Sequence, residues 1–410
     1  MRGPPSAEAM NSGLRDRAAI IGIGETVYTK RGGATQSEMA LACEAIRRAV
    51  ADAGLNIDDV DGLSAYSGDR CTIIEVAQAL NLQLRFANLY PGGGNAATGV
   101  VQNAAMAVAT GTARVVVCYR ALSQGQVRYG QARSGFGAHA VNSAAPLTYA
   151  SGAQAFTAPF GLMTPAQNYA LEARRHMHLY GTTSEQMGMV AVGCYANAQL
   201  NPRAVMYGRP LTLEQHQASR VISDPYRLFD CCQESDGACA LVVTSREQAR
   251  DAPTPPVLIA GAAQGMHSGD GAHRAGRPEE LWASAGMTEV AREVYAAAGV
   301  SPDEIDVLQI YENFTGQVIM ALEDFGFCKR GEGGPYVQSG ATHWPHGRTP
   351  MNTSGGNLAE AYIHGLSLVL EGVRQIRGQS TAQVREAEHC LVVSGPGAPP
   401  SSALILRRGS

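Results

Sequence analysis

Cysteines, histidines and glycine-rich turns are the residues of this chain whose types could do chemistry. The nine cysteines include no Cys-x-x-Cys pair, so their spacing favours neither a zinc ribbon nor a disulfide framework. The segment 343–346 (HWPH) lacks neighbouring Cys or carboxylate ligands, and we interpret it as a loop. The run 92–94 (GGG) lacks the spacing of a dinucleotide-binding turn, and close backbone approach at a helix start is its expected role. We therefore expect no metal and no redox cofactor.

Composition and charge exclude several classes of protein. The 410 residues are 45% hydrophobic and carry a formal net charge of −4, which gives no basic face for nucleic acid. Residues 1–17 lack the apolar core of a signal peptide, and no apolar run approaches the roughly 18 residues that cross a bilayer. The odd number of cysteines favours a reducing compartment, so the expected location is the cytoplasm.

An internal repeat shows which elements must position any site. Residues 45–66 (AIRRAVADAGLNIDDVDGLSAY) and 290–311 (VAREVYAAAGVSPDEIDVLQIY) each predict an amphipathic helix, a glycine that ends it, a short turn and a buried strand. The turn at 301–304 (SPDE) has the form of a capping box. Matching positions recur at a constant offset: Gly54 with Gly299, Asp61 with Asp306, Leu63 with Leu308, and Tyr66 with Tyr311.

Further apolar segments extend each copy into a β-α-β half. The segments 18–24 and 256–263 precede the two copies, and a glycine-rich turn, a helix and another apolar strand follow each. This order predicts a duplicated α/β fold whose sheets are covered on both faces. We expect a first half at 17–255 and a second half at 256–410.

A stretch of different composition, at about 121–225, interrupts the first half. It is rich in small and aromatic residues, and its later part predicts helices at 165–178 and 183–199. We interpret it as an inserted loop domain that serves as a lid or an interface. Its apolar part at 145–163 is a candidate surface for a partner or a substrate.

Several long motifs, in this order, are similar to those of the thiolase superfamily, and above all to the sterol-carrier-protein-type thiolases and their aldolase relatives. The resemblance covers about 18–408, and four stretches carry it: 176–192 (HMHLYGTTSEQMGMVAV), 200–212 (LNPRAVMYGRPLT), 230–245 (DCCQESDGACALVVTS) and 352–365 (NTSGGNLAEAYIHG). It implies a thiolase fold, in which the two halves form a five-layered αβαβα core, and a homodimer.

The residues that thiolases use for chemistry are replaced. The family's nucleophilic cysteine lies at the start of the helix after the glycine-rich turn, where this chain has Gly94, and no cysteine lies between residues 72 and 117. The final glycine-rich turn, 392–397, has no thiol. Tyr362 takes the place of the family's histidine and Tyr311 that of its asparagine. Covalent transfer through cysteine is therefore not expected.

The two tyrosines resemble the pattern of the thiolase-like aldolases of steroid side-chain degradation. The resemblance implies retro-aldol cleavage of a β-hydroxyacyl-CoA to a ketone or aldehyde plus a short acyl-CoA, with a small OB-fold, zinc-ribbon protein as partner. Such cleavage needs a base for the β-hydroxyl and donors for the departing enolate. We hypothesise that Tyr311 and Tyr362 share these roles. His364 and Glu312 are expected to tune the tyrosines, with Asn352 as a further supporting residue. Backbone N–H groups near Gly395 and Gly397 could add oxyanion donors, as such turns do in the family that the chain resembles.

Each of these assignments has a structural alternative. Tyr362 could be a core aromatic residue on a buried helix. Tyr311 and Tyr66 could both be structural, since they occupy matching strand ends. His364 is expected to contact catalytic groups rather than to act on substrate. The chain could also be an acyltransferase subunit or a non-catalytic acyl-CoA or lipid carrier, although a carrier has no need of polar groups in its cleft.

Overall fold

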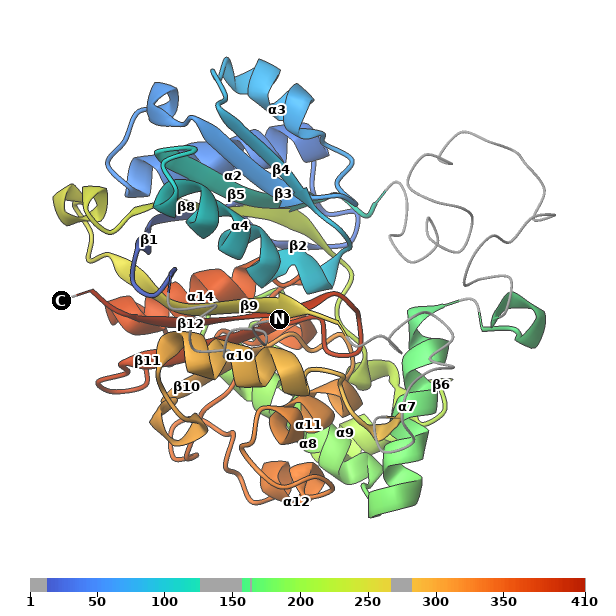
Figure 1. Ribbon diagram of the computed structural model, residues 1–410. Helices are drawn as coiled ribbons and strands as arrows, with labels where there is room; N and C mark the ends of the chain where they lie inside the picture. Colours follow the sequence, from blue (N-terminus) through green and yellow to red (C-terminus); the bar gives the residue numbers. More distant parts are fainter. Residues whose placement is uncertain (1–12, 126–156, 163, 267–281, 410) are drawn as a thin grey trace.

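Two similar α/β halves are joined in one molecule, with helices from both halves between their sheets (Figure 1). The computed structural model describes residues 13–125, 157–162, 164–266 and 282–409. The first half comprises β1 (Ala18–Glu25), β2 (Thr29–Lys30), α2 (Glu38–Asp52), β3 (Gly62–Tyr66), α3 (Ile73–Leu80), β4 (Phe86–Tyr90), α4 (Ala97–Ala109), β5 (Val115–Leu122) and β8 (Ser235–Ser245). The second comprises β9 (Val257–Gly265), α10 (Thr288–Ala298), β10 (Val307–Ile310), α11 (Thr315–Asp324), α12 (Gly333–Gln338), α13 (Gly356–Ala359), α14 (Leu366–Arg377), β11 (His389–Ser394) and β12 (Ser401–Arg408).

The strands of both halves follow one hydrogen-bonded path. In the described residues its order is β10-β11-β12-β9-β1-β8-β5-β3-β4, and β2 pairs with β8 beside it. The repeated strands pair in parallel, as β10 with β11 and β3 with β5. The halves meet where β1 pairs with β9, over two residue pairs. β8 pairs antiparallel with β1, β5 and β2, and β12 pairs antiparallel with β9 and β11, so the sheets are mixed.

Three hydrophobic clusters fill the spaces between the helices and sheets of the expected five layers. One packs α2 on the outer face of the first half's strands. A second places α4 and α14 between the strands of the two halves. The third lies beneath the outer helices of the second half, which include α10 and α11. The order of layers is therefore helix, sheet, helix, sheet, helix, as predicted.

The matched positions of the repeat do the same work in each half. Asp61 Oδ1 accepts the N–H groups of Arg114 and Val115 at the start of β5, at 2.8 and 2.9 Å. Asp306 Oδ2 accepts the N–H groups of Glu388 and His389 at the start of β11, at 2.8 and 2.9 Å. The two glycines after α2 and α10 have φ of 70° and 71°, which favours glycine. The predicted capping box at 301–304 is confirmed.

The insertion contains α7 (Pro165–Tyr180), α8 (Ser184–Ala198), α9 (Leu213–Ala218), β6 (Val221–Ser223) and β7 (Tyr226–Arg227). The three α-helices α7, α8 and α9 each begin with a Thr-x-x-Gln capping box, at Thr164, Thr183 and Thr212. The predicted helices are confirmed. Most of 145–163, the predicted apolar surface, lies outside the described residues.

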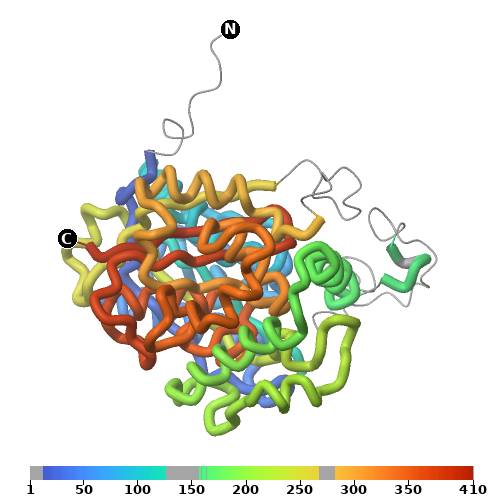
Figure 2. The backbone as a smooth tube through the Cα atoms, turned by 90° about the horizontal axis from the view of Figure 1, so that it is seen from below, coloured from blue at the N-terminus to red at the C-terminus, as the bar shows by residue number. Residues whose placement is uncertain are grey.

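The insertion belongs to the first half in sequence but packs against the second half in space. Residues of α8 join the cluster that contains α11, and Figure 2 shows these green segments beside the orange ones. The core resumes with β8 at Ser235, ten residues beyond the predicted end of the insertion at 225. No helix in the described part of the chain is long and apolar enough to cross a membrane.

Candidate active site

Two tyrosines far apart in sequence meet at the boundary between the two halves. Tyr311 follows β10, and Tyr362 lies in the segment between α13 and α14. Their hydroxyl oxygens are 3.3 Å apart, and their rings are 6.4 Å apart at an angle of 52°. Tyr311 is buried and Tyr362 is half-buried. The structure thus brings together the two residues predicted to share the chemistry.

Gly94 lies directly against the ring of Tyr311. It begins the short 3₁₀ turn Gly94–Ala96, which leads into α4, so it lies at the helix start where the sequence predicted the former nucleophile position. A Cβ atom at Gly94 would lie 1.9 Å from Cζ of Tyr311 and 2.0 Å from its hydroxyl oxygen. Any larger residue would collide there. The room that glycine leaves is therefore filled by the phenol.

A second glycine confines the same ring from the other segment of the site. Gly365 has φ 78°, and a Cβ there would lie 2.5 Å from Cδ2 of Tyr311. Tyr311 is thus held between backbone at the start of α4 and backbone at the start of α14. Its position depends on the lack of side chains at both glycines.

Tyr362 lies in a non-helical segment, which contradicts the alternative that it is a core aromatic residue on a buried helix. Gly355, Gly356, His364 and Gly365 all have positive φ, which breaks the helix on both sides of the tyrosine. The backbone N–H of Tyr362 donates to Oγ of Ser235, at 3.1 Å. From this segment the phenol reaches that of Tyr311.

His364 lies behind Tyr362 and is fully buried. Its ring is perpendicular to that of Tyr362, with centroids 5.0 Å apart. Arg120 Nε donates to His364 Nδ1 at 2.9 Å, and Tyr66 donates its hydroxyl to the His364 carbonyl at 3.3 Å. Arg120 also forms a buried ion pair with Asp69. Sequence reasoning missed Arg120 and Asp69, although an arginine in the apolar strand β5 was a usable signal.

Glu312 points away from the Tyr311 side chain, because successive side chains of an extended segment point in opposite directions. Glu312 accepts Nδ2 of Asn357 at 2.9 Å and the N–H of Leu358 at 3.3 Å. Burial raises the pKa of Glu312 to about 7, against the lowering effect of these hydrogen bonds. Asn352 bonds both backbone groups of Ile310. Both side chains hold the 352–358 loop against β10.

The final glycine-rich turn packs against the start of α4. A Cβ at Gly395 would lie 2.4 Å from that of Asn95, and Ser394 Oγ accepts the N–H of Thr98 at 3.2 Å. The N–H of Gly397 donates to the carbonyl of Ala285 at 2.8 Å. Gly397 would have to give up this bond to serve as an oxyanion donor.

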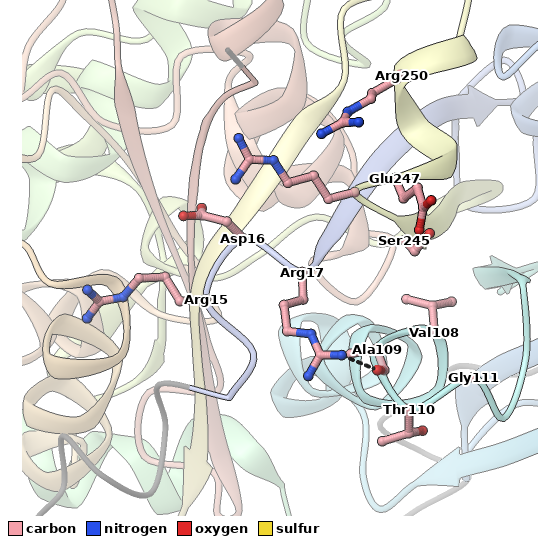
Figure 3. Close-up of a pocket in the computed structure, with 11 residues that line it drawn as sticks. Arg15, Asp16, Arg17, Val108, Ala109, Thr110, Gly111, Ser245, Glu247 and Arg250 are labelled. Atoms are coloured by element: carbon pink, nitrogen blue, oxygen red, sulfur yellow. Dashed lines mark hydrogen bonds between the residues drawn. The ribbon is translucent and has the colours of Figure 1, made fainter.

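A basic hollow of about 840 Å³ lies at the opposite end of α4 (Figure 3). Thirteen residues of helix separate it from the turn at Gly94, which is roughly 20 Å at 1.5 Å per residue. Arg15 Nε donates to the carbonyl of Ala297 and Arg17 Nη2 to that of Ala109, so two of its arginines cap helix ends. None of the predicted site residues lines it.

Comparisons with known proteins agree with this fold. Residues 271–408 match the family model described as thiolase C-terminal domain-like. The human mitochondrial 3-ketoacyl-CoA thiolase superposes with a TM-score of 0.69 over 97% of this chain and 100% of its own, at 15% identity. The chain therefore has the thiolase fold, with tyrosines at the positions described above.

Relatives at higher identity define the group within that fold. A steroid side-chain-cleaving aldolase of Thermomonospora curvata is 46% identical over 96% of this chain and 98% of its own length. The 17-hydroxy-3-oxo-4-pregnene-20-carboxyl-CoA lyase of Mycobacterium tuberculosis is 43% identical over 96% and 100%. A solved structure described as the Ltp2-ChsH2(DUF35) aldolase has a TM-score of 0.87 at 44% identity, over 97% of this chain and 99% of its own. This chain belongs to the family of steroid side-chain-cleaving aldolases, and it is an acyl-CoA carbon–carbon lyase.

Proposed function

We propose that this aldolase cleaves a steroid β-hydroxyacyl-CoA between the α and β carbons, with Tyr311 and Tyr362 as the polar groups at the reacting atoms. The β-hydroxyl loses its proton and becomes a ketone carbonyl, the carbon–carbon bond breaks, and its electrons enter the thioester enolate. A proton then adds to the α carbon and gives the shorter acyl-CoA. The contact between the two phenols beside the former nucleophile position carries this proposal.

The surroundings of the tyrosine pair support non-covalent chemistry. The former nucleophile position is a glycine whose side-chain space is taken by Tyr311. Cys194, which lies 4.0 Å from Glu312 Oε1, is buried, and burial raises its pKa well above its ordinary value. A thiolate is the form that attacks an acyl group, so burial keeps this thiol inert.

The two phenols can divide the proton transfers between them. Their contact of 3.3 Å lets one hydroxyl accept a proton as the other donates. The start of α4 lies against Tyr311, and the positive end of a helix favours negative charge nearby. Charge that develops on an enolate or phenolate at this point would therefore be stabilised.

Removal of either hydroxyl tests the assignment. Tyr311→Phe and Tyr362→Phe should each lower kcat by about 100-fold or more, the usual size of a proton-transfer contribution, while the melting temperature stays nearly unchanged. The assay follows release of a ketone and a shorter acyl-CoA from 17-hydroxy-3-oxo-4-pregnene-20-carboxyl-CoA. Tyr207→Phe, at a residue 52% exposed, is the matched control. Near-normal turnover by both variants would remove the tyrosines from the mechanism, and binding without cleavage by the unaltered chain would favour a carrier.

The edge strand β4 supports a homodimer. β4 lies at one end of the strand path. Within the described residues no strand pairs with its outer edge, whose backbone N–H and C=O groups could pair with a second chain. Ala87 and Leu89 alternate as exposed residues along it, and Leu89 is 54% exposed. Leu89→Lys should shift the chain from dimer to monomer in light scattering at micromolar concentration. A dimer that survives this change at unaltered affinity would place the interface elsewhere.

We further propose that a small OB-fold, zinc-ribbon protein binds this chain and that the complex works in the cytoplasm. The name of the similar Ltp2-ChsH2(DUF35) aldolase structure supports such a complex. All nine cysteines are free thiols, which supports a reducing compartment. Co-expression with a protein of this class, followed by co-purification on a tag carried by one of the two chains, tests the association.

A further inference from the structure

A buried chain of polar groups runs from the first half of the molecule to the segment that carries Tyr362. It begins at Asp69 in the turn after β3, continues through Arg120 on β5, and ends at the imidazole of His364. The Arg120 side chain is 1% exposed and that of Asp69 is 2% exposed. A buried arginine must have groups that accept its hydrogen bonds and balance its charge, because an uncompensated charge is strongly disfavoured away from water.

The hydrogen bond between Arg120 and His364 determines where the imidazole holds its proton. A guanidinium keeps all its protons and can only donate. Nε of Arg120 donates to Nδ1 of His364 at 2.9 Å, so Nδ1 must present a lone pair. The imidazole is then neutral, and its one N–H is on Nε2.

Two more contacts fix His364 in place. The hydroxyl of Tyr66 donates to the His364 carbonyl at 3.3 Å, and the Tyr66 ring lies under the guanidinium of Arg120, 5.2 Å from its central carbon. His364 itself has φ 48°, a conformation that a non-glycine residue adopts only when its surroundings hold it. Its ring then stands perpendicular to Tyr362.

We propose that Asp69 and Arg120 are positioning residues that lock His364 as the neutral Nε2–H tautomer and thereby fix the ring of Tyr362 for catalysis. Both act on Tyr362 through His364, whose Nδ1 accepts from Arg120 and whose ring packs against that of Tyr362. This inference rests on the proposed role of Tyr362. Residues of the first half, Asp69 and Arg120, would then hold in place the segment of the second half that carries Tyr362.

The hydrogen bond from Arg120 favours the neutral imidazole among the groups that surround it. The titratable or charged side chains that face it, directly or through Arg120, include Tyr66 from β3, Asp69 from the following turn, Arg120 from β5 and Tyr362 from its own segment. The thiols of Cys118 on β5 and Cys239 on β8 lie beside Tyr66. Burial raises the pKa of Tyr66 and of both thiols, so these three stay protonated and uncharged.

Nitrogen NMR of the full chain labelled in its histidine rings tests the tautomer directly, with the His364→Gln spectrum identifying the signals. We expect an unprotonated Nδ1 and a protonated Nε2 that do not change between about pH 5.5 and 8.5. In Arg120→Gln, Nδ1 no longer accepts from a guanidinium, so His364 should instead take up a proton on acidification. A protonated Nδ1 in the unaltered chain would overturn the inference, whatever the activity.

Kinetics separate positioning from a merely structural role. Arg120→Gln and Asp69→Asn should lower kcat at least tenfold, change KM less than threefold, and add an acid limb to the pH profile of kcat. Arg120→Lys keeps the charge but loses the fixed Nε donor, so it should resemble Arg120→Gln. Arg114→Gln, at an arginine with a 62% exposed side chain on the same stretch, should leave both the NMR signals and kcat unchanged.

The outcomes distinguish this inference from the proposed function. If Tyr362→Phe turns over normally while the unaltered chain shows the expected tautomer, the role of Tyr362 fails and the lock remains only a structural feature. If the Arg120 variants do not fold, the spectrum of the unaltered chain and the His364→Gln kinetics still decide. Full kcat in His364→Gln, at unchanged pH dependence, would refute positioning through this residue.

Discussion

Gly94→Ala is the change that most directly probes the arrangement of Tyr311. The added Cβ would lie 1.9 Å from Cζ and 2.0 Å from the hydroxyl oxygen, whereas carbon atoms in contact are usually about 3.5–4.0 Å apart. The phenol must therefore shift by roughly 1.5–2 Å at the end that does the chemistry. The ring cannot move freely, because the backbone at Gly365 lies against its Cδ2 edge.

The shift has a cost in both rate and stability. A misplacement of about 1 Å can lower a rate about 100-fold, so we expect kcat to fall by about that factor or more. Overpacking of a filled site should lower the free energy of unfolding by about 1–3 kcal/mol. Steady-state cleavage of the steroid thioester and urea unfolding at pH 7 measure the two effects.

A second substitution isolates the clash. In a Tyr311→Ala background the alanine at position 94 meets no phenol, so Gly94→Ala should then cost almost no stability. Gly265→Ala is the matched control, since its Cβ would meet a single atom at an ordinary 3.8 Å. If Gly94→Ala alone keeps its full kcat and stability, the ring of Tyr311 does not lie where we describe it.

Two further predictions concern stability. The pKa of Glu312 is raised from 4.5 to about 7, so the folded state binds its proton more tightly than the unfolded state does. Its contribution to the free energy of unfolding is therefore present below pH 4.5 and is lost as the pH rises through 7. Between pH 5 and 8.5 the Glu312→Gln variant should therefore become more stable relative to the unaltered chain, by up to about 3 kcal/mol. Urea unfolding of both proteins at pH 5 and pH 8.5 measures this change. An equal difference in the free energy of unfolding at the two pH values would contradict the raised pKa. Asp61→Ala leaves the buried N–H of Val115 without its acceptor and should lower the free energy of unfolding by about 1–3 kcal/mol. Asp306→Ala should cost less, because water can reach the N–H of Glu388 that Asp306 binds. Equal losses of stability for the two variants in urea unfolding would refute the comparison.

Much of the fold follows from local patterns that repeat in the sequence. The helices, the strands at 18–24 and 256–263 and the glycines at helix ends depend on apolar periodicity and backbone conformation, which neighbouring residues set. Local patterns could not predict that the insertion packs on the second half, because this depends on which apolar faces of distant segments come into contact. The break around Tyr362 was missed because a positive φ at His364 is imposed by its buried contacts.

The sequence by itself determined the scaffold and the replacement of thiolase residues, since both are questions of which residue stands at which position of a known pattern. Tertiary structure alone decided how the replacements fit together. Tyr311 fills the space above Gly94, and Arg120 reaches His364 across 244 residues of chain. Glu312 turns away from the phenols although it is adjacent to one of them. Such contacts depend on how two folded halves meet, and local propensity contains no information about that meeting.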